Sequence, residues 1–436
     1  MKNYSDLSVY DAFQQRLDYI FQEFDNIYIS FSGGKDSGVL LHLVMDYMTS
    51  KGINKKVGLF HQDMEAQYEK TTEYVTAMYQ KFLPRVEPYW FCIPIATRTA
   101  LSNYEMWWFP WDDTKEDIWV RPMPTMEYVY NLKNNPMTTY HYKMLYTEHA
   151  KQFGRWYKDS HGGGKTIGLI GLRTDESLHR YSGIVNKRND YKGQKWITEH
   201  MNNVWSASPL YDFDVHDIWL ANYRFGYNYN PIYDLFFMAG VELSDMRVAS
   251  PFNDEAKTSL NLYRVLEPET WAKLLGRVQG VNFAAIYAKT KAMGYKDITL
   301  PPPHTWESYT KFLLATLPDE IRKQYEQKFA FSTTYWAKTG GGLPEETIQE
   351  IEASGFKVRR NGKSNYTKDG KTRITFDTIP DHTDKVTTNK KDVPSWKRNC
   401  LCILRNDHLC KGMGFGLTKY QQVEKSALIK KYNEQL

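Results

Sequence analysis

The fold is decided by the stretch Ile27-Tyr28-Ile29-Ser30-Phe31-Ser32-Gly33-Gly34-Lys35-Asp36-Ser37. A short apolar run of strand character ends in a glycine-rich turn, and residues 37–50 then place apolar side chains on one face at helical spacing. The glycines allow the backbone to turn tightly and to approach a ligand closely. Because free N–H groups at a helix start bind anions, the stretch predicts a phosphate-binding loop between a strand and a helix.

The polar residues of this loop are the first candidate binding residues. The hydroxyls of Ser32 and Ser37 and the charge of Lys35 are suited to phosphate, and Asp36 is a candidate to orient a Mg²⁺ ion or to shape the loop. The loop is not a Walker A motif, which requires G-x-x-x-x-G-K-[ST]. The stretch His161 to Thr166 comes nearer to that pattern, but Asp159 stands where its first glycine is required.

The sequence around the loop alternates between strand and helix patterns. Apolar runs at 56–61, 86–95 and 166–171 have strand character, whereas residues 66–81 have helical spacing. This rhythm predicts an α/β fold with a doubly wound, mostly parallel sheet. We expect a nucleotide-binding domain over residues 1–240 with an aromatic-rich insertion at about 103–165, and a mainly helical, basic accessory domain over residues 241–436.

A second motif follows the strand pattern at 166–171. It reads Gly171-Leu172-Arg173-Thr174-Asp175-Glu176-Ser177, with Arg180 three residues on. Arg173 and Arg180 offer planar guanidinium groups suited to phosphate or sulfate, and Glu176 can hold one of them in place. The alternative is an ordinary helix start, with Asp175 and Glu176 near its positive end.

Together, the two motifs resemble those of the PP-loop ATP pyrophosphatase superfamily, and Gly171 to Ser177 resembles the G-x-R-x-x-E-S motif of phosphoadenosine phosphosulfate (PAPS) reductase-like proteins. The resemblance extends over residues 25–240, through the stretches 208–210, 214–219 and 230–234. It implies an adenine nucleotide alpha hydrolase-like fold that binds ATP, PAPS or adenosine phosphosulfate. It also implies that Asp63, in His61-Gln62-Asp63-Met64-Glu65, lies near the adenosine.

The chain departs from the reductases after this stretch. Many of these proteins carry paired cysteines there, but residues 240–249 contain none, so we expect no iron–sulfur cluster at this position. The cysteines after Cys92 are Cys400, Cys402 and Cys410, with His408 among them. This segment resembles a subfamily with an extended C-terminal domain, the immunoglobulin-binding regulator A-like proteins, which implies a ParB-like partner. The side chains themselves leave three alternatives: buried structural cysteines, a zinc site, or a sulfur carrier.

The distribution of charge and of apolar residues bears on whether the protein binds nucleic acid or spans a membrane. The 436 residues carry a net charge of +5, while residues 351–400 hold 12 Lys or Arg and 6 Asp or Glu. Such a basic segment suits either a nucleic acid or a solvated surface. The polar N-terminus and the lack of an apolar run of about 18 residues lead us to expect a cytoplasmic protein that does not span a membrane.

The leading functional hypothesis is adenylation. A nucleophile would attack the α-phosphate of ATP and release pyrophosphate, with Lys35, Asp36, Arg173 and Arg180 as the catalytic candidates. The adenine nucleotide would be held by Ser32, Gly33, Gly34, Lys35, Asp36, Ser37, Asp63, Gly171, Arg173 and Glu176. Nucleic-acid thiolation is one outcome of such chemistry. The alternatives are sulfonucleotide reduction, or a nucleotide-bound regulator without enzyme activity.

Overall fold

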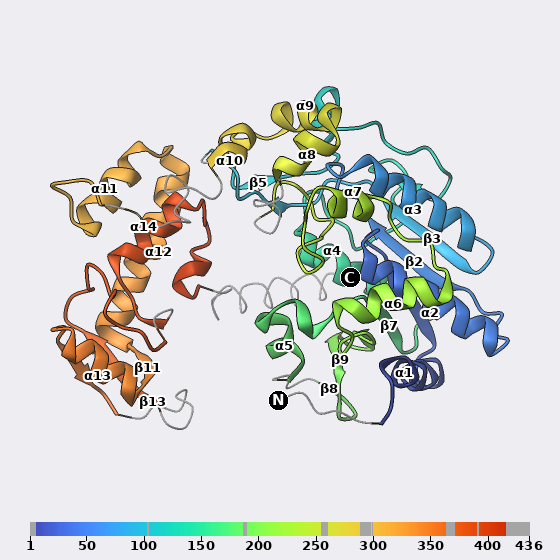
Figure 1. The fold of residues 1–436 in the computed structure, drawn as a ribbon, viewed down its shortest axis with the longest axis horizontal. Helices are drawn as coiled ribbons and strands as arrows, with labels where there is room; N and C mark the ends of the chain where they lie inside the picture. The colour runs from blue at the N-terminus through green and yellow to red at the C-terminus, as the bar shows by residue number, and fades with distance from the viewer. Residues whose placement is uncertain are drawn as a thin grey trace. The chain divides into compact units, whose positions relative to one another are not determined.

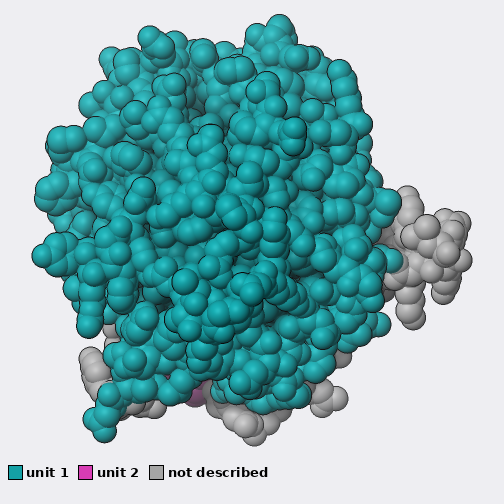
Figure 2. Space-filling model, turned by 90° about the vertical axis from the view of Figure 1, so that its right-hand side faces the viewer, with its two compact units in different colours: residues 1–98, 107–277 teal, residues 99–106, 278–436 magenta. Residues whose placement is uncertain are grey.

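The computed structural model describes residues 6–102, 104–185, 190–253, 260–287, 298, 300–362, 371–389 and 392–415. The chain forms two compact units (Figures 1 and 2). The first unit contains Met1–Arg98 and Trp107–Arg277, and the second contains Thr99–Met106 and Val278–Leu436. Within the described ranges, we find no helix long and apolar enough to cross a membrane.

The first unit is built on an eight-stranded sheet. Its strands lie in the order β6 (Val129–Tyr130), β3 (Val86–Phe91), β2 (Val57–Gln62), β1 (Asn26–Ser30), β7 (Thr166–Ile170), β10 (Val204–Ala207), β9 (Gln194–Met201) and β8 (Asp190–Tyr191). The pairings from β6 to β10 are parallel, whereas β9 pairs antiparallel with both β10 and β8. The expected α/β fold with a mostly parallel sheet is therefore confirmed.

Helices cover both faces of this sheet because alternate strand residues point to opposite sides. Ile27 and Ile29 of β1 belong to the core cluster that includes residues of α1, α2 and α3, whereas Tyr28 packs with Phe153 and Tyr157 of α4. The helices of the first unit are α1 (Val9–Glu23), α2 (Lys35–Ser50), α3 (Glu69–Phe82), α4 (Tyr146–Ser160), α5 (Leu178–Val185), α6 (Val215–Phe225), α7 (Ile232–Met238), α8 (Leu260–Leu266) and α9 (Pro268–Arg277). The 3₁₀ turns η1 (Asp113–Ile118) and η2 (Thr174–Glu176) and the strand pair β4 (Thr97–Arg98) and β5 (Trp107–Trp108) complete it.

The second unit is mainly helical, with a small antiparallel sheet in the order β11 (Gly341–Pro344), β13 (Lys371–Phe376) and β12 (Val358–Arg360). Its other elements are α10 (Val281–Tyr287), α11 (Trp306–Thr316), α12 (Asp319–Thr334), the π-helical turn η5 (Tyr335–Thr339), α13 (Glu345–Ala353), α14 (Trp396–Leu404) and η7 (Lys411–Met413). The sequence of residues 357–378 predicts a basic hairpin that turns at Asp369-Gly370; β12 and β13 lie in this range and pair antiparallel, whereas the turn lies outside the described residues.

Two features of the expected organisation look different in the structure. The compact units divide after Arg277 rather than near residue 240, because residues 241–277 pack with the sheet unit: Met246 is buried, and Arg277 pairs with Glu65. The aromatic-rich range 103–165 contains β6, which pairs with β3, and α4, which packs on the sheet. Much of its aromatic content therefore fills the core of the first unit.

Candidate functional site

The two sequence motifs meet where the strand order reverses. From β1 the chain proceeds to β2 and β3 on one side, and it later returns to place β7 on the other side of β1. Residues 32–37 follow β1 and residues 171–177 follow β7, so both motifs leave the carboxyl ends of adjacent parallel strands. Open α/β sheets bind their ligands in the crevice at this kind of position.

The glycine loop is held in a tight conformation by its neighbours. Gly33 has φ +78°, and a Cβ atom there would lie 2.7 Å from Val75 Cγ2. The buried Asn230 donates from Nδ2 to the carbonyl oxygen of Gly33 at 3.0 Å and to Thr71 Oγ1 at 2.9 Å. The hydroxyls of Ser32 and Ser37 lie 3.0 Å apart. The loop is therefore shaped by contacts that do not require a ligand.

Gly171 brings the second motif directly against the loop. A Cβ atom on this residue would lie 2.9 Å from the backbone nitrogen of Ser37 and 3.0 Å from the carbonyl carbon of Asp36. Both are backbone atoms at the start of α2, and such atoms cannot move aside as a flexible side chain can. The close approach of the two backbones therefore requires glycine at this position.

Lys35 is covered by the segment after α7. Its side chain is 4% exposed, and Nζ donates to the carbonyl oxygen of Met246 at 2.9 Å. Its backbone N–H donates to the hydroxyl of Tyr233 at 2.9 Å. Burial lowers the pKa of Lys35, an effect that the charge of Asp36 partly opposes. Both groups of Lys35 that could meet a phosphate are thus occupied by the chain itself.

Arg173 links the second motif to the loop. It is 3% exposed, and Nε donates to Asp36 Oδ1 at 2.5 Å. Nη1 is buried without a hydrogen-bond partner, although Asp175 Oδ2 lies 3.5 Å away. Nη2 lies 3.9 Å from Glu176 Oε1. A buried guanidinium nitrogen that makes no hydrogen bond, beside the loop, is able to donate to an anion.

Glu176 gathers two further arginines around this centre. Its carboxylate pairs with Arg180 Nη1 at 2.5 Å, and its backbone oxygen accepts from Arg247 Nη2 at 3.3 Å. The cations of the site outnumber its carboxylates: Lys35, Arg173, Arg180 and Arg247 against Asp36, Asp175 and Glu176. The excess positive charge favours an anion.

Asp63 is surrounded by residues other than those of the glycine loop. Its buried carboxylate accepts hydrogen bonds from Arg121, from the indole nitrogens of Trp90 and Trp111, and from the backbone of Glu65. Burial by itself would raise its pKa, but the neighbouring Arg121 holds that pKa below the usual value. These contacts anchor residues 111–121 to the end of β2. His61 lies closer to the loop, because its Nδ1 is 2.7 Å from the carbonyl oxygen of Phe31.

The expected metal sites are not assembled. Within the described ranges, no three His, Cys, Asp or Glu side chains are arranged to hold a metal ion. Cys400, Cys402 and Cys410 are buried, and His408 Nε2 lies 3.1 Å from the carbonyl oxygen of Ser102. The described structure therefore gives no support to a zinc site at these four residues, all of which are buried in the second unit. Burial raises the pKa of Cys400 to about 12.

Three basic residues of the segment 351–400 form ion pairs with acidic residues in its described part. Its ion pairs are Arg359 with Asp377, Arg360 with Glu345 and Glu352, and Lys397 with Asp384. Residues 363–370, 390 and 391 lie outside the described ranges. Part of the positive charge counted in the sequence is therefore neutralised by acidic neighbours in the described part of this segment.

Sequence reasoning missed four residues that shape the site. Asn230 and Tyr233 belong to the stretch 230–234, whose resemblance was noted without a role for either residue. Met246 and Arg247 lie in a segment that attracted notice only because it lacks cysteine. Contacts over such sequence separations have no local signal in the sequence.

Comparison with known proteins agrees with this geometry. Residues 26–89 match the phosphoadenosine phosphosulfate reductase domain, and residues 240–424 match a domain of unknown function, DUF3440. The chain is 29% identical over 438 residues to the uncharacterized protein YbdN of Escherichia coli (strain K12), covering 99% of this chain and 94% of that protein.

Three solved structures show weaker similarity. PAPS reductase of Candida auris in a phosphate complex is 16% identical, with 53% of this chain and 85% of that chain covered and a TM-score of 0.30. FMN adenylyltransferase of Candida glabrata with FMN and an ATP analogue is 13% identical, with coverages of 53% and 64% and a TM-score of 0.31. The tRNA thiolase NcsA of Methanococcus maripaludis is 12% identical, with coverages of 66% and 82% and a TM-score of 0.31.

The domain match at 26–89 contains the glycine loop, and the match at 240–424 covers most of the second unit. The motifs and the mostly parallel sheet agree with the first match. The chain therefore combines a region similar to the phosphoadenosine phosphosulfate reductase domain with a C-terminal region similar to DUF3440.

Proposed function

We propose that the first unit binds an adenine nucleotide through residues 32–37 and transfers its adenylyl group to an acceptor. The observation that supports this most directly is Nη1 of Arg173, a buried guanidinium nitrogen without a hydrogen-bond partner beside the loop. A buried donor left unpaired is unfavourable, and a phosphate oxygen would supply a charge-assisted partner. The excess of cations around Glu176 points to the same class of ligand.

In the proposed reaction, a lone pair of the acceptor forms a bond to the α-phosphorus of ATP. The bond from that phosphorus to the bridging oxygen breaks, and pyrophosphate leaves with the electron pair. The acceptor gives up its proton to water. Arg173 and the backbone N–H groups at the start of α2 would stabilise the charge that develops on the phosphate oxygens. For Lys35 to take part, its ammonium must exchange the carbonyl oxygen of Met246 for a phosphate.

Asp36 is poorly placed to hold Mg²⁺ in the arrangement that the structure shows. Its Oδ1 accepts from Arg173, and its Oδ2 lies 3.5 Å from the ammonium of Lys35. No set of three acidic or histidine side chains surrounds it within the described residues. To hold a Mg²⁺ ion, Asp36 would have to give up one of these cationic partners, and nucleotide phosphates and water would have to supply the other ligands. No step of the proposed reaction passes through a metal ion.

Sulfonucleotide reduction lacks a comparable observation. It needs a cysteine thiolate, but all four cysteines are buried. Burial raises the pKa of Cys92 and Cys400, and the pKa of Cys402 is raised first by its hydrogen bond with Cys410 and then by burial. Such thiols remain protonated at neutral pH and are weak nucleophiles.

The first test is thermal stabilisation of the full chain by ATP, PAPS and adenosine phosphosulfate. A ligand at 100 times its dissociation constant should stabilise the chain by about 2.7 kcal/mol, which is a shift of a few degrees. We expect a shift with ATP, largely lost in Arg173→Gln and retained in the control Arg322→Gln, whose ion pairs lie on the surface of α12. Release of pyrophosphate from ATP is measured in parallel.

The outcomes separate the hypotheses. Stabilisation by PAPS alone would favour the reductase alternative. Binding of ATP without release of pyrophosphate, whatever acceptor is supplied, would favour a nucleotide-bound regulator and justify a search for a ParB-like partner. No stabilisation by any of the three nucleotides would contradict the proposal.

A further inference from the structure

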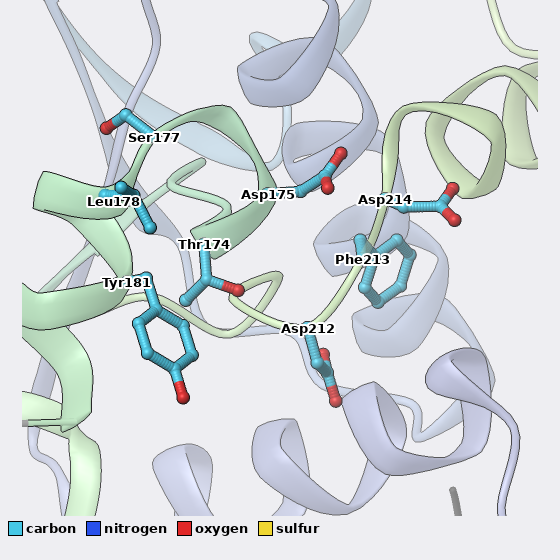
Figure 3. A pocket seen from close by; sticks show the side chains of 8 residues that line it. All are labelled: Thr174, Asp175, Ser177, Leu178, Tyr181, Asp212, Phe213 and Asp214. Atoms are coloured by element: carbon cyan, nitrogen blue, oxygen red, sulfur yellow. The ribbon is translucent and has the colours of Figure 1, made fainter. Parts of the chain in front are cut away.

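A pocket lies next to the phosphate site, between α5 and the segment that precedes α6. It has a volume of about 350 Å³, within the range of pockets that hold small molecules. Figure 3 shows Leu178 and Tyr181 on one side and Asp212 and Phe213 on the other, with Thr174 between them. The lining residues are Thr174, Asp175, Ser177, Leu178, Tyr181, Asp212, Phe213 and Asp214.

This pocket is joined to the phosphate site by a short series of contacts. Asp175 lines the pocket and lies 3.5 Å from Arg173, which in turn donates to Asp36 in the loop. Thr174 fixes the opposite wall, because its hydroxyl and its backbone N–H both donate to the carbonyl oxygen of Tyr211. A molecule in the pocket would therefore sit beside the nucleotide rather than at a remote surface.

The lining has a definite chemical character. It contains three carboxylates, on Asp175, Asp212 and Asp214, and none of its eight described residues is basic. Asp212 is held by Arg16, and Asp214 caps α6, so these two are already engaged. Asp175 is 43% exposed and its contact with Arg173 is long, so it is the carboxylate best able to accept a new partner.

Two apolar residues of the lining are exposed, whereas Phe213 is buried. Leu178 is 86% exposed and Tyr181 is 45% exposed, although both belong to α5 at the mouth of the pocket. An aromatic face beside a carboxylate favours a cation that carries an apolar group. We propose that this pocket binds the acceptor of the adenylyl group, and that this acceptor is a small molecule bearing an amino or other cationic group beside an apolar part.

The same lining disfavours a polyanion. The phosphates of a nucleic acid would meet three carboxylates without a basic residue among the described lining, and like charges brought together oppose binding. The inference rests on the proposed function in one respect: that the molecule bound in this pocket is the acceptor of the adenylyl group. The charge preference of the pocket can be measured independently of ATP.

The test compares phenethylamine with 3-phenylpropanoate, which have the same ring and opposite charge, by ligand-observed NMR on the full chain. We expect phenethylamine to bind at millimolar concentrations and the carboxylate to bind at least about tenfold more weakly. Asp175→Asn and Tyr181→Ala should each weaken the amine about threefold or more. Tyr223→Ala, an exposed tyrosine on α6, serves as the matched control and should change nothing.

Equal binding of the two probes, no binding of the amine, or binding unaffected by both pocket substitutions would overturn the inference. So would displacement of phenethylamine by a single-stranded oligonucleotide. Stabilisation by ATP, measured on Tyr181→Ala, distinguishes the two proposals. If the amine binds as expected but ATP stabilises neither the unsubstituted chain nor this variant, the pocket stands and the adenylation proposal fails.

Discussion

The glycine loop of the first unit and the cysteine segment of the second unit make an instructive comparison. Each gathers chemically capable residues within a short stretch of sequence, at 32–37 and at 400–410. Around the loop, Arg173 and Arg247 arrive from distant segments and leave an excess of positive charge. Around the cysteines, all three thiols are buried, and the described residues contain no set of three side chains arranged to hold a metal ion. Residue type alone therefore does not make a site; distant groups must converge on it.

A buried nitrogen without a hydrogen-bond partner is weaker evidence for a ligand site when no other charged groups converge on it. His149 is an example. His149 is fully buried among Phe60, Phe91 and Tyr140, and neither ring nitrogen has a hydrogen-bond partner. Burial lowers its pKa to about 3. We assign it no ligand, since it packs in an apolar cluster on the sheet rather than at the strand ends.

Between pH 6.5 and about 3, the unfolded chain binds a proton at His149 that the folded chain does not bind. The free energy of unfolding should therefore fall on acidification through this window, by about 2 kcal/mol at pH 5 relative to pH 7 from this group alone. His149→Leu should remove that part of the slope in urea unfolding measured at both pH values. His216→Gln, which alters an exposed histidine, should leave the slope unchanged; an unaltered slope in His149→Leu would show that this ring is hydrated or paired.

Gly171 tests whether the two motifs act together. In Gly171→Ala, the added methyl group would press on the backbone of Ser37 and Asp36, which we expect to destabilise the chain by about 1–3 kcal/mol and to abolish stabilisation by ATP. Thermal unfolding with and without ATP measures both effects. Gly183→Ala is the matched control, because a Cβ atom there meets nothing within 4 Å and the residue lies in α5. That control should stabilise the chain slightly, by up to about 1 kcal/mol.

The smallest effect is expected at the cysteine segment. Because the thiols are buried and no set of metal ligands is found among the described residues, we expect a chelator to leave the thermal midpoint of the full chain unchanged. Thiol reagents should react slowly with the folded chain and quickly in denaturant. A fall in the thermal midpoint with chelator, accompanied by release of zinc, would support the zinc hypothesis. The cysteine segment would then bind a ligand, as we propose for the loop.

The sheet could be predicted well because its signals are local. The apolar run at β1, the glycine turn and the helical spacing of α2 each lie within a few residues of one another. The candidates Arg173, Glu176 and Arg180 were also found in this way and do lie together. Asp63 was placed near the nucleotide by resemblance, whereas the hydrogen bonds that the structure shows for its carboxylate tie it to residues 65–121.

By itself, the sequence determined the class of the fold, the position of the phosphate loop and the motif that follows β7, because strand, turn and helix preferences act over short distances along the chain. Only the tertiary structure decided which groups surround that loop. It brought Asn230 to Gly33, Met246 to Lys35 and Gly171 to the backbone of Ser37. It also buried the cysteines and paired some of the described basic side chains, among them Arg360 and Lys397. The physical reason is that burial and pairing depend on contacts between residues far apart in sequence, which no local pattern records.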